Sequence, residues 1–320
     1  MNQPSKSLAQ RDIENVLHPY TNIASHNETG PLIITKGEGI YVYDENGKKY
    51  IEGLAGLWCT SLGFDNKQLV EAANKAMNEL PFYHSFGGKS HPSAIALAEK
   101  LLDMAPVPMS KVFFANSGSE ANDTAVKIIW YINNQRGNTK KKKLIARKHG
   151  YHGVTLMTSG LTGLPNNHRD FDLPLNRVLH TDCPHYYRYK KDNESEEQFA
   201  TRCADNLRKL ILKEGQDTIA AFFAEPVIGA GGVIPPPKTY FEKIQKILKE
   251  YRILFVVDEV ICGFGRTGNM FGSQTYNLQP DMISLAKGLS SGYLPISALM
   301  VSENIFRSIK IESKKIGIFS

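Results

Sequence analysis

The sequence contains no uninterrupted apolar run of about 18 residues, so we expect no membrane-spanning helix. It also lacks a C-x-x-C pair, because its four cysteines are scattered. This spacing argues against a disulfide framework and against a structural zinc site, favours a reducing compartment, and leads us to expect no metal. The four are Cys59, Cys183, Cys203 and Cys262.

The first 17 residues, MNQPSKSLAQRDIENVL, lack the apolar stretch of a signal peptide. We therefore expect a cytoplasmic protein. The net charge is only +6, and Lys140–Lys143 form the one basic block. No aromatic residues are interleaved with these lysines, so we interpret the block as a solvated loop and expect no nucleic-acid partner.

Short apolar strands alternate with helices from residue 111 onward. This alternation predicts an α/β fold with a mostly parallel sheet covered on both faces. We predict strands over 111–116, 143–148, 219–225, 253–259 and 281–286, and helices over 119–135, 196–214 and 238–251. Before them, apolar periodicity predicts helices over 66–80 and 91–105. The dipeptide Asn46-Gly47 predicts a β-hairpin with a type I′ turn.

The segment GFGRTG (263–268) matches G-x-G-x-x-G and comes soon after a strand. In a dinucleotide site these glycines would open a long helix. The residues that follow, NMFGSQTYNLQPDM, have no helical apolar stripe and are interrupted by Gly272 and Pro280. We therefore interpret the glycines as part of a loop. A P-loop is excluded because G-x-x-x-x-G-K-[ST] does not occur.

In a parallel sheet, ligands bind at the carboxyl ends of strands, and two of these ends suit an aromatic phosphate. Ser117-Gly118-Ser119 opens a helix, whose N–H groups and dipole favour an anion. The same residues also fit an ordinary helix N-cap. Tyr151 lies between glycines, where its ring could stack on a ligand or simply face solvent.

Ionisable residues mark three further strand ends. Asp258 follows the apolar run LFVV, and a buried carboxylate requires a partner, either a protonated pyridine nitrogen or a salt bridge. Lys287 follows DMISLA and is either a solvated lysine or a Schiff-base lysine whose pKa burial lowers. Glu225 ends the strand at 219–225. A helix N-terminus that can bind phosphate, an aromatic side chain that can stack on a ring, a buried acid and a lysine together are the groups expected of a pyridoxal phosphate site.

Several long motifs, in order and spacing, resemble the class III aminotransferases of fold type I. They are FFANSGSEAN, RKHGYHG, AEPVIGAGGVIPPP, VVDEVICGFGRTG and PDMISLAKGLSSGYLPISA. The earlier motifs HPYT, GLWCTSLG and ELPFYHSF resemble the ω-transaminases, the amine–pyruvate group. The resemblance extends from about residue 18 to the C-terminus.

The resemblance implies that pyridoxal 5'-phosphate is the cofactor, with Lys287 and Asp258 as the catalytic residues. Lys287 forms the Schiff base, and Asp258 binds the pyridine N–H. The cofactor-binding residues implied are Ser117, Gly118 and Ser119 near the phosphate, Tyr151 and Val260 on the two ring faces, and Glu225 close by. The substrate pocket implied contains Tyr20, Leu57, Trp58, Phe86 and Ala230.

The activity implied is transfer of an amino group from an amine or ω-amino acid to a keto acid, with pyruvate as the expected acceptor, by a ping-pong mechanism. The resemblance also implies a homodimer. It assigns residues 1–60, with the β-hairpin, to part of a small domain and 61–320 to the cofactor-binding large domain.

The sequence ends 33 residues after Lys287 (320 − 287). Members of the family continue further, with a phosphate-binding threonine supplied across the dimer and a small domain whose arginine binds the substrate carboxylate. We therefore expect a chain truncated at its C-terminus, with little or no transaminase activity alone. The alternative is that the chain is not an enzyme but a truncated, non-catalytic remnant that keeps the pyridoxal-phosphate-binding core.

Overall fold

A computed structural model describes residues 6–173 and 175–316 of the chain. Its internal contacts divide the chain into two compact units, Met1–Pro81 and Phe82–Ser320. Each unit is described by itself below. The division into family domains at 1–60 and 61–320 stays a prediction.

The smaller unit combines short helices with a three-stranded antiparallel sheet in the order β1-β2-β3. Its helices carry no residue that is fully buried. The elements are α1 (Leu8–Asn15), α2 (Ile23–Thr29), β1 (Ile34–Glu38), β2 (Tyr41–Asp44), β3 (Lys49–Ile51), α3 (Ala55–Trp58) and α4 (Lys67–Glu79). Helix α4 confirms the helix predicted over 66–80.

The predicted hairpin is present as β2 and β3, but its predicted turn type is wrong. A type I′ turn needs positive φ at both central residues, and here Gly47 (φ 78°) has it while Asn46 does not. Asp44 organises the turn instead. Its Oδ1 accepts hydrogen bonds from the backbone N–H groups of Asn46 (2.9 Å) and Lys48 (3.0 Å). The longer loop that results leaves only one residue in the left-handed region.

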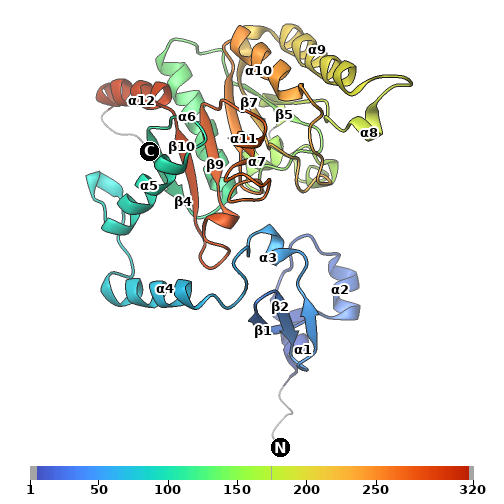
Figure 1. The fold of residues 1–320 in the computed structure, drawn as a ribbon, viewed down its shortest axis with the longest axis vertical. Coiled ribbons are helices and arrows are strands. Elements are labelled where there is room, and N and C mark those ends of the chain that lie inside the picture. The colour runs from blue at the N-terminus through green and yellow to red at the C-terminus, as the bar shows by residue number, and fades with distance from the viewer. Residues whose placement is uncertain (1–5, 174, 317–320) are drawn as a thin grey trace, which may run out of the picture. The chain divides into compact units, whose positions relative to one another are not determined.

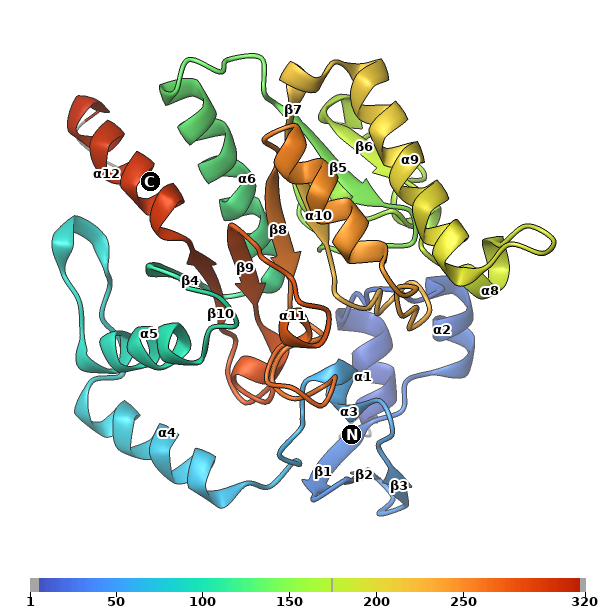
Figure 2. The ribbon, with the colours of Figure 1, turned by 45° about the horizontal axis from the view of Figure 1, so that its top comes forward.

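The larger unit contains a seven-stranded sheet with the order β4-β10-β9-β8-β7-β5-β6 (Figures 1 and 2). All five predicted strands are present, and β6 and β10 were not predicted. The strands are β4 (Lys111–Ala115), β5 (Lys143–Arg147), β6 (Val178–Thr181), β7 (Ile219–Ala224), β8 (Leu254–Asp258), β9 (Met282–Leu285) and β10 (Ser297–Val301). Only β10 runs antiparallel to its neighbours, so the mostly parallel sheet is confirmed.

Helices cover both faces of this sheet. The helices predicted over 91–105, 119–135, 196–214 and 238–251 are all found, with ends shifted by one or two residues. The helices are α5 (Pro92–Met104), α6 (Gly118–Gln135), α7 (Leu156–Leu161), α8 (Tyr186–Tyr189), α9 (Glu196–Glu214), α10 (Tyr240–Glu250), α11 (Gly272–Thr275) and α12 (Glu303–Ile316).

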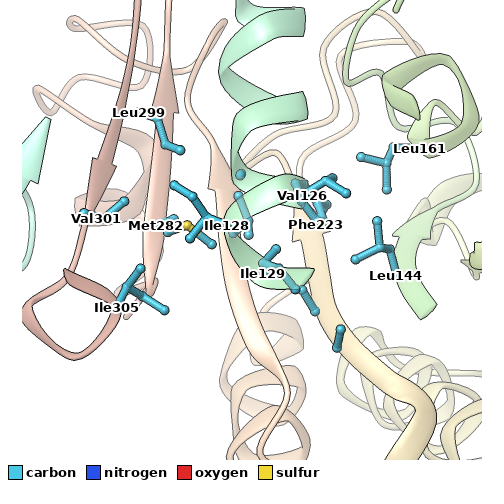
Figure 3. Packing of buried hydrophobic residues seen from close by; sticks show 14 of the residues in the cluster. Val126, Ile128, Ile129, Leu144, Leu161, Phe223, Met282, Leu299, Val301 and Ile305 are labelled. Carbon is cyan, nitrogen blue, oxygen red and sulfur yellow. The ribbon is translucent and has the colours of Figure 1, made fainter. Parts of the chain in front are cut away.

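Two buried apolar clusters explain why the sheet has helices on each side. One joins α6 and α12 to the sheet, and Figure 3 shows its α6 residues Ile128 and Ile129 among side chains from the strands. The other joins α9 and α10 to the opposite face through residues such as Leu207, Ile244 and Phe222. From Ala221 to Ala224, successive residues of β7 alternate between the two clusters, as the period of a strand requires.

Two predictions made from the sequence, on membrane-spanning helices and on the lysine block, can be compared with the structure. Among the described residues, no helix is long and apolar enough to cross a membrane. The lysine block at 140–143 is only partly a solvated loop, because Lys143 begins β5 and its ammonium lies 2.7 Å from the Glu214 carboxylate.

Candidate active site

The predicted cofactor residues of the larger unit lie where strands of its sheet end. Asp258 is the last residue of β8, and Ser284 of β9 is its neighbour in the ladder. Lys287 follows β9 after a short extended segment and opens a 3-10 turn over Lys287–Leu289. Since β8 and β9 are adjacent and parallel, their carboxyl ends lie at one edge of the sheet. The structure therefore brings the acid and the lysine to neighbouring strand ends.

Asp258 is buried, with 3% of its surface exposed, and two side chains bind one of its oxygens. Its Oδ2 accepts a hydrogen bond from Asn122 Nδ2 (2.8 Å) and lies 2.9 Å from His152 Nδ1. The other oxygen, Oδ1, accepts the backbone N–H of Val260 at 3.1 Å. A carboxylate oxygen can accept more than one hydrogen bond, so Oδ1 retains capacity for a further donor.

Sequence reasoning missed both Asn122 and His152. The sequence predicted either a protonated ring nitrogen or a salt bridge as the partner of Asp258. The contact with His152 agrees better with the salt bridge. Asn122 also donates to the backbone carbonyl of His152 at 2.9 Å, so the three residues form one buried cluster. The sequence offers little that identifies these two residues: Asn122 ends the motif SGSEAN, and His152 follows Tyr151. Their separations of 136 and 106 residues from Asp258 concealed the contact.

The start of α6 fits both interpretations of Ser117-Gly118-Ser119. Ser117 is an ordinary N-cap, because its hydroxyl accepts the N–H of Glu120 (3.2 Å). The hydroxyl of Ser119 accepts the N–H of Val154 (3.1 Å), which ties the helix start to the loop after β5. An 18-residue helix with this start still directs its positive end toward the strand ends.

Gly118 is required by close packing rather than by its backbone angles. A Cβ atom there would lie 2.9 Å from Cγ2 of Val260 and 3.6 Å from Cβ of Ala286. Ala286 immediately precedes Lys287. The start of α6, the residue after the Asp258–Glu259 pair and the residue before the lysine therefore meet at Gly118.

Glu225 holds two of the predicted loops in place. Its Oε1 accepts the N–H of Tyr151 (3.0 Å), and its Oε2 accepts the N–H of Gly229 (2.8 Å). The side chain is 2% exposed, and burial raises the pKa of Glu225 above its ordinary value. Glu225 thus connects the Tyr151 loop to the loop that carries Ala230.

The carboxylate next to Asp258 in the sequence, that of Glu259, has a structural function. Glu259 is fully buried, and its oxygens accept the N–H groups of Gly272 (3.0 Å) and Ser273 (2.6 Å). It also accepts the hydroxyl of Ser273. Glu259 therefore anchors the start of the short helix at Gly272–Thr275 that follows the GFGRTG segment, and only Asp258 belongs to the candidate site.

The GFGRTG segment is a loop, as predicted. Gly265 and Gly268 have φ of 96° and 87°, and the helix that follows, α11, has only four residues. Phe264 of this loop lies beside the lysine turn, because a Cβ at Gly288 would be 3.1 Å from Cδ2 of Phe264. The loop therefore borders the strand end that carries Lys287.

The predicted substrate residues are distributed over both units. Phe86 and Ala230 are exposed residues of the larger unit, while Tyr20, Leu57 and Trp58 belong to the smaller one. Tyr20, Leu57 and Trp58 all have positive φ, at 53°, 74° and 62°. Such backbone angles are uncommon for these residue types and are typical of functional loops. The pocket itself stays a prediction.

The site combines a buried acid at one strand end, a lysine at the next strand end and the N-terminus of a helix. The aminotransferase class-III family model matches residues 23–316. The chain belongs to this family, whose members use pyridoxal phosphate.

Named relatives and solved structures agree with that assignment. The chain is 58% identical over 306 residues to "Gamma aminobutyrate transaminase 3, chloroplastic" of Solanum lycopersicum, covering 95% of this chain and 59% of that protein. It is 57% identical over 305 residues to "Vanillin aminotransferase" of Capsicum chinense, covering 95% and 66%. The omega transaminase from Pseudomonas jessenii in complex with PMP has a TM-score of 0.97 and 59% identity, covering 98% of this chain and 69% of that one. The structural match confirms the predicted fold, and the chain spans about three fifths of the first of these relatives.

Proposed function

We propose that this chain binds pyridoxal phosphate and takes part in amino-group transfer between an amine donor and a keto acid. The observation that carries the proposal is Asp258, buried at the end of β8 and fixed by Asn122 and His152. The adjacent parallel strand ends just before Lys287. An acid fixed beside a lysine is the protein's part in pyridoxal chemistry.

The residues present fit this cofactor. The buried Asp258 keeps acceptor capacity on Oδ1, which suits a ring N–H. The N-terminus of α6 suits a phosphate. The packing at Gly118 brings Val260 and Ala286 close to that N-terminus.

Pyridoxal phosphate, when bound, supplies an electron sink for the pair left when a substrate C–H bond breaks. Lys287 holds the cofactor through its amine and, once released, carries the proton taken from the substrate carbon. Asp258 stabilises a protonated ring nitrogen, and its two neighbours keep its carboxylate oriented. Tyr151 and Val260 would bound the two faces of the ring, and Gly118 and Ser119 would hold the phosphate.

We further propose that the donor is an amine or ω-amino acid, that pyruvate is the acceptor and that the cycle is ping-pong. Support comes from relatives named for γ-aminobutyrate and vanillin, and from the omega transaminase structures. The apolar residues Trp58 and Phe86 suit a donor with an apolar substituent. The homodimer and the cytoplasmic location predicted from the sequence are part of this proposal and rest on the sequence arguments alone.

The test is alanine formation from pyruvate and an amine donor by the purified chain with added pyridoxal phosphate. We expect γ-aminobutyrate or an arylalkyl amine to support only slow alanine formation, in line with the low activity expected of this chain alone, and Lys287→Ala to abolish it. The exposed lysine variant Lys249→Ala, in the last turn of α10, is the matched control and should keep the rate. If the chain binds pyridoxal phosphate but forms no alanine, the result would contradict amino-group transfer and favour the non-catalytic remnant.

A further inference from the structure

Three metal-ligating side chains meet in the smaller unit, away from the residues considered so far. Asp12 lies on α1, His18 on the following loop and His26 on α2. Nε2 of His18 is 2.8 Å from Asp12 Oδ2, and Nε2 of His26 is 3.2 Å from the same oxygen. The two imidazole centroids are 4.3 Å apart. One oxygen and two imidazole nitrogens thus converge on a single point.

We propose that Asp12, His18 and His26 form a zinc site, with water as the fourth ligand. Two imidazoles and a carboxylate are a donor set that zinc binds in proteins. The scattered cysteines argued against a zinc site at the sequence level, but this donor set uses none of them.

The distances suit an ion at this point. Zinc bonds of about 2.0–2.1 Å in tetrahedral geometry place ligand atoms about 3.3 Å apart. The three ligand atoms here lie within 4.8 Å of one another, and the two contacts to Asp12 are near that spacing. Small rotations of the imidazoles are enough to admit the ion.

The protonation pattern also suits replacement by a metal. Both Nε2 atoms approach the same carboxylate oxygen, so in the metal-free state each presents its proton to that oxygen. A zinc ion would take the place of these protons and satisfy all three groups at once.

The surroundings give the ion a structural purpose. Helices α1 and α2 have only eight and seven residues, and neither contains a buried residue. Helices this short are marginal without tertiary support, and small segments often gain it from a metal. The side chains of Asp12, His26 and His18 are 16%, 10% and 30% exposed, so the trio is partly shielded from water. Zinc would join α1, the loop and α2, and so fix the loop that carries Tyr20.

The experiment is zinc titration of the full 320-residue chain by calorimetry, with cobalt(II) as a spectroscopic probe. We expect one zinc per chain and a tetrahedral cobalt spectrum. His26→Gln keeps a hydrogen-bond donor for Asp12 but removes a ligand, so it should weaken zinc binding at least about tenfold. His185→Gln, outside the trio, is the matched control and should bind as the unaltered chain does.

A thiolate variant separates ligation from a hydrogen-bonding role. His26→Cys should keep zinc binding and add a thiolate-to-cobalt charge-transfer band that the unaltered chain lacks, and His18→Cys should do the same from the loop. Circular dichroism checks that each variant is folded. Absence of stoichiometric zinc binding, or equal affinity in the unaltered chain and His26→Gln, would overturn the proposal. Because the test needs no pyridoxal phosphate, its outcome is independent of the proposed function.

Discussion

Asp258 is the residue on which the proposed cofactor chemistry depends most. Its carboxylate is buried and held by Asn122 and His152, so its Oδ1, which also accepts the Val260 N–H, has a fixed direction. Asp258→Asn should weaken pyridoxal phosphate binding by about 10- to 100-fold, since hydrogen bonds to charged groups contribute about 1.5–3 kcal/mol. Fluorescence titration with the cofactor measures this. The exposed variant Asp205→Asn is the control, and an unchanged affinity in Asp258→Asn would count against the proposed role.

Asn122 supports Asp258 and the loop after β5 through separate hydrogen bonds. Asn122→Ala removes its bonds to Asp258 (2.8 Å) and to the His152 carbonyl (2.9 Å), leaving buried acceptors with fewer donors. We expect a loss of about 2–4 kcal/mol in the free energy of unfolding, measured by urea denaturation. Asn134→Ala changes an exposed residue of the same helix and controls for helix propensity. A loss no greater than that of the control would contradict the prediction.

Gly118 sits where three segments of the site meet. In Gly118→Ala the new methyl group would lie 2.9 Å from Val260 Cγ2, so we expect a loss of about 1–3 kcal/mol in stability from overpacking. Shortening the neighbour in Gly118→Ala/Val260→Ala should recover part of it. A double-mutant cycle should therefore give a favourable coupling of about 0.5–3 kcal/mol between the two substitutions. Additive effects would show that the two residues are not in close contact.

At the residue scale, strand ends could be found from the sequence but their partners could not. Apolar runs that end at Asp258 and before Lys287 mark these two positions without any structure. Asn122 and His152 reach Asp258 from distant parts of the chain, and nothing in their local sequence indicates that contact. The function of Glu259 was equally hidden, because its partners Gly272 and Ser273 lie 13 and 14 residues further along the chain.

At the scale of elements, ion pairs fix some helix starts and make them sensitive to pH. Glu194, just before α9, accepts two hydrogen bonds from Arg202, and this pairing lowers the pKa of Glu194 to about 2. Its stabilising effect is therefore fully present above the ordinary glutamate pKa and is lost as the pH falls toward 2. Glu194→Gln should flatten the decline in urea midpoint between pH 5 and pH 3.

The matched control for that experiment is Asp192→Asn, two residues earlier in the same loop. It removes a more exposed acid of the same loop without disturbing the pair with Arg202. If the unaltered chain and Glu194→Gln lose stability equally on acidification, the ion pair is not responsible for the pH dependence.

The elements that were predicted from sequence are those with a clear apolar period. Strands β4, β5, β7, β8 and β9 and their helices were identified with ends within one or two residues. The two unpredicted strands show what periodicity misses. Strand β6 has only four residues at an edge of the sheet, and β10 inserts antiparallel between β4 and β9. That insertion depends on long-range pairing, which no local pattern encodes.

At the scale of the whole molecule, family membership rests on a match over residues 23–316, and the candidate cofactor site lies within one unit. The residues predicted for the substrate pocket come from both units, with Trp58 in the smaller and Phe86 in the larger. The cofactor site can therefore be tested on its own. Its ligand should stabilise the folded state by an amount that grows with the logarithm of the ligand concentration above the dissociation constant.

The most direct test of the central claim is the visible absorption spectrum of the purified chain with added pyridoxal phosphate, recorded beside Lys287→Ala and Lys249→Ala. We predict a visible absorption band from bound pyridoxal phosphate in the unaltered chain and in Lys249→Ala, and we expect an amine donor to bleach this band. We expect the band to be absent in Lys287→Ala. The same spectrum in all three proteins, unchanged by amine, would contradict the assignment of Lys287 and Asp258 to a pyridoxal phosphate site.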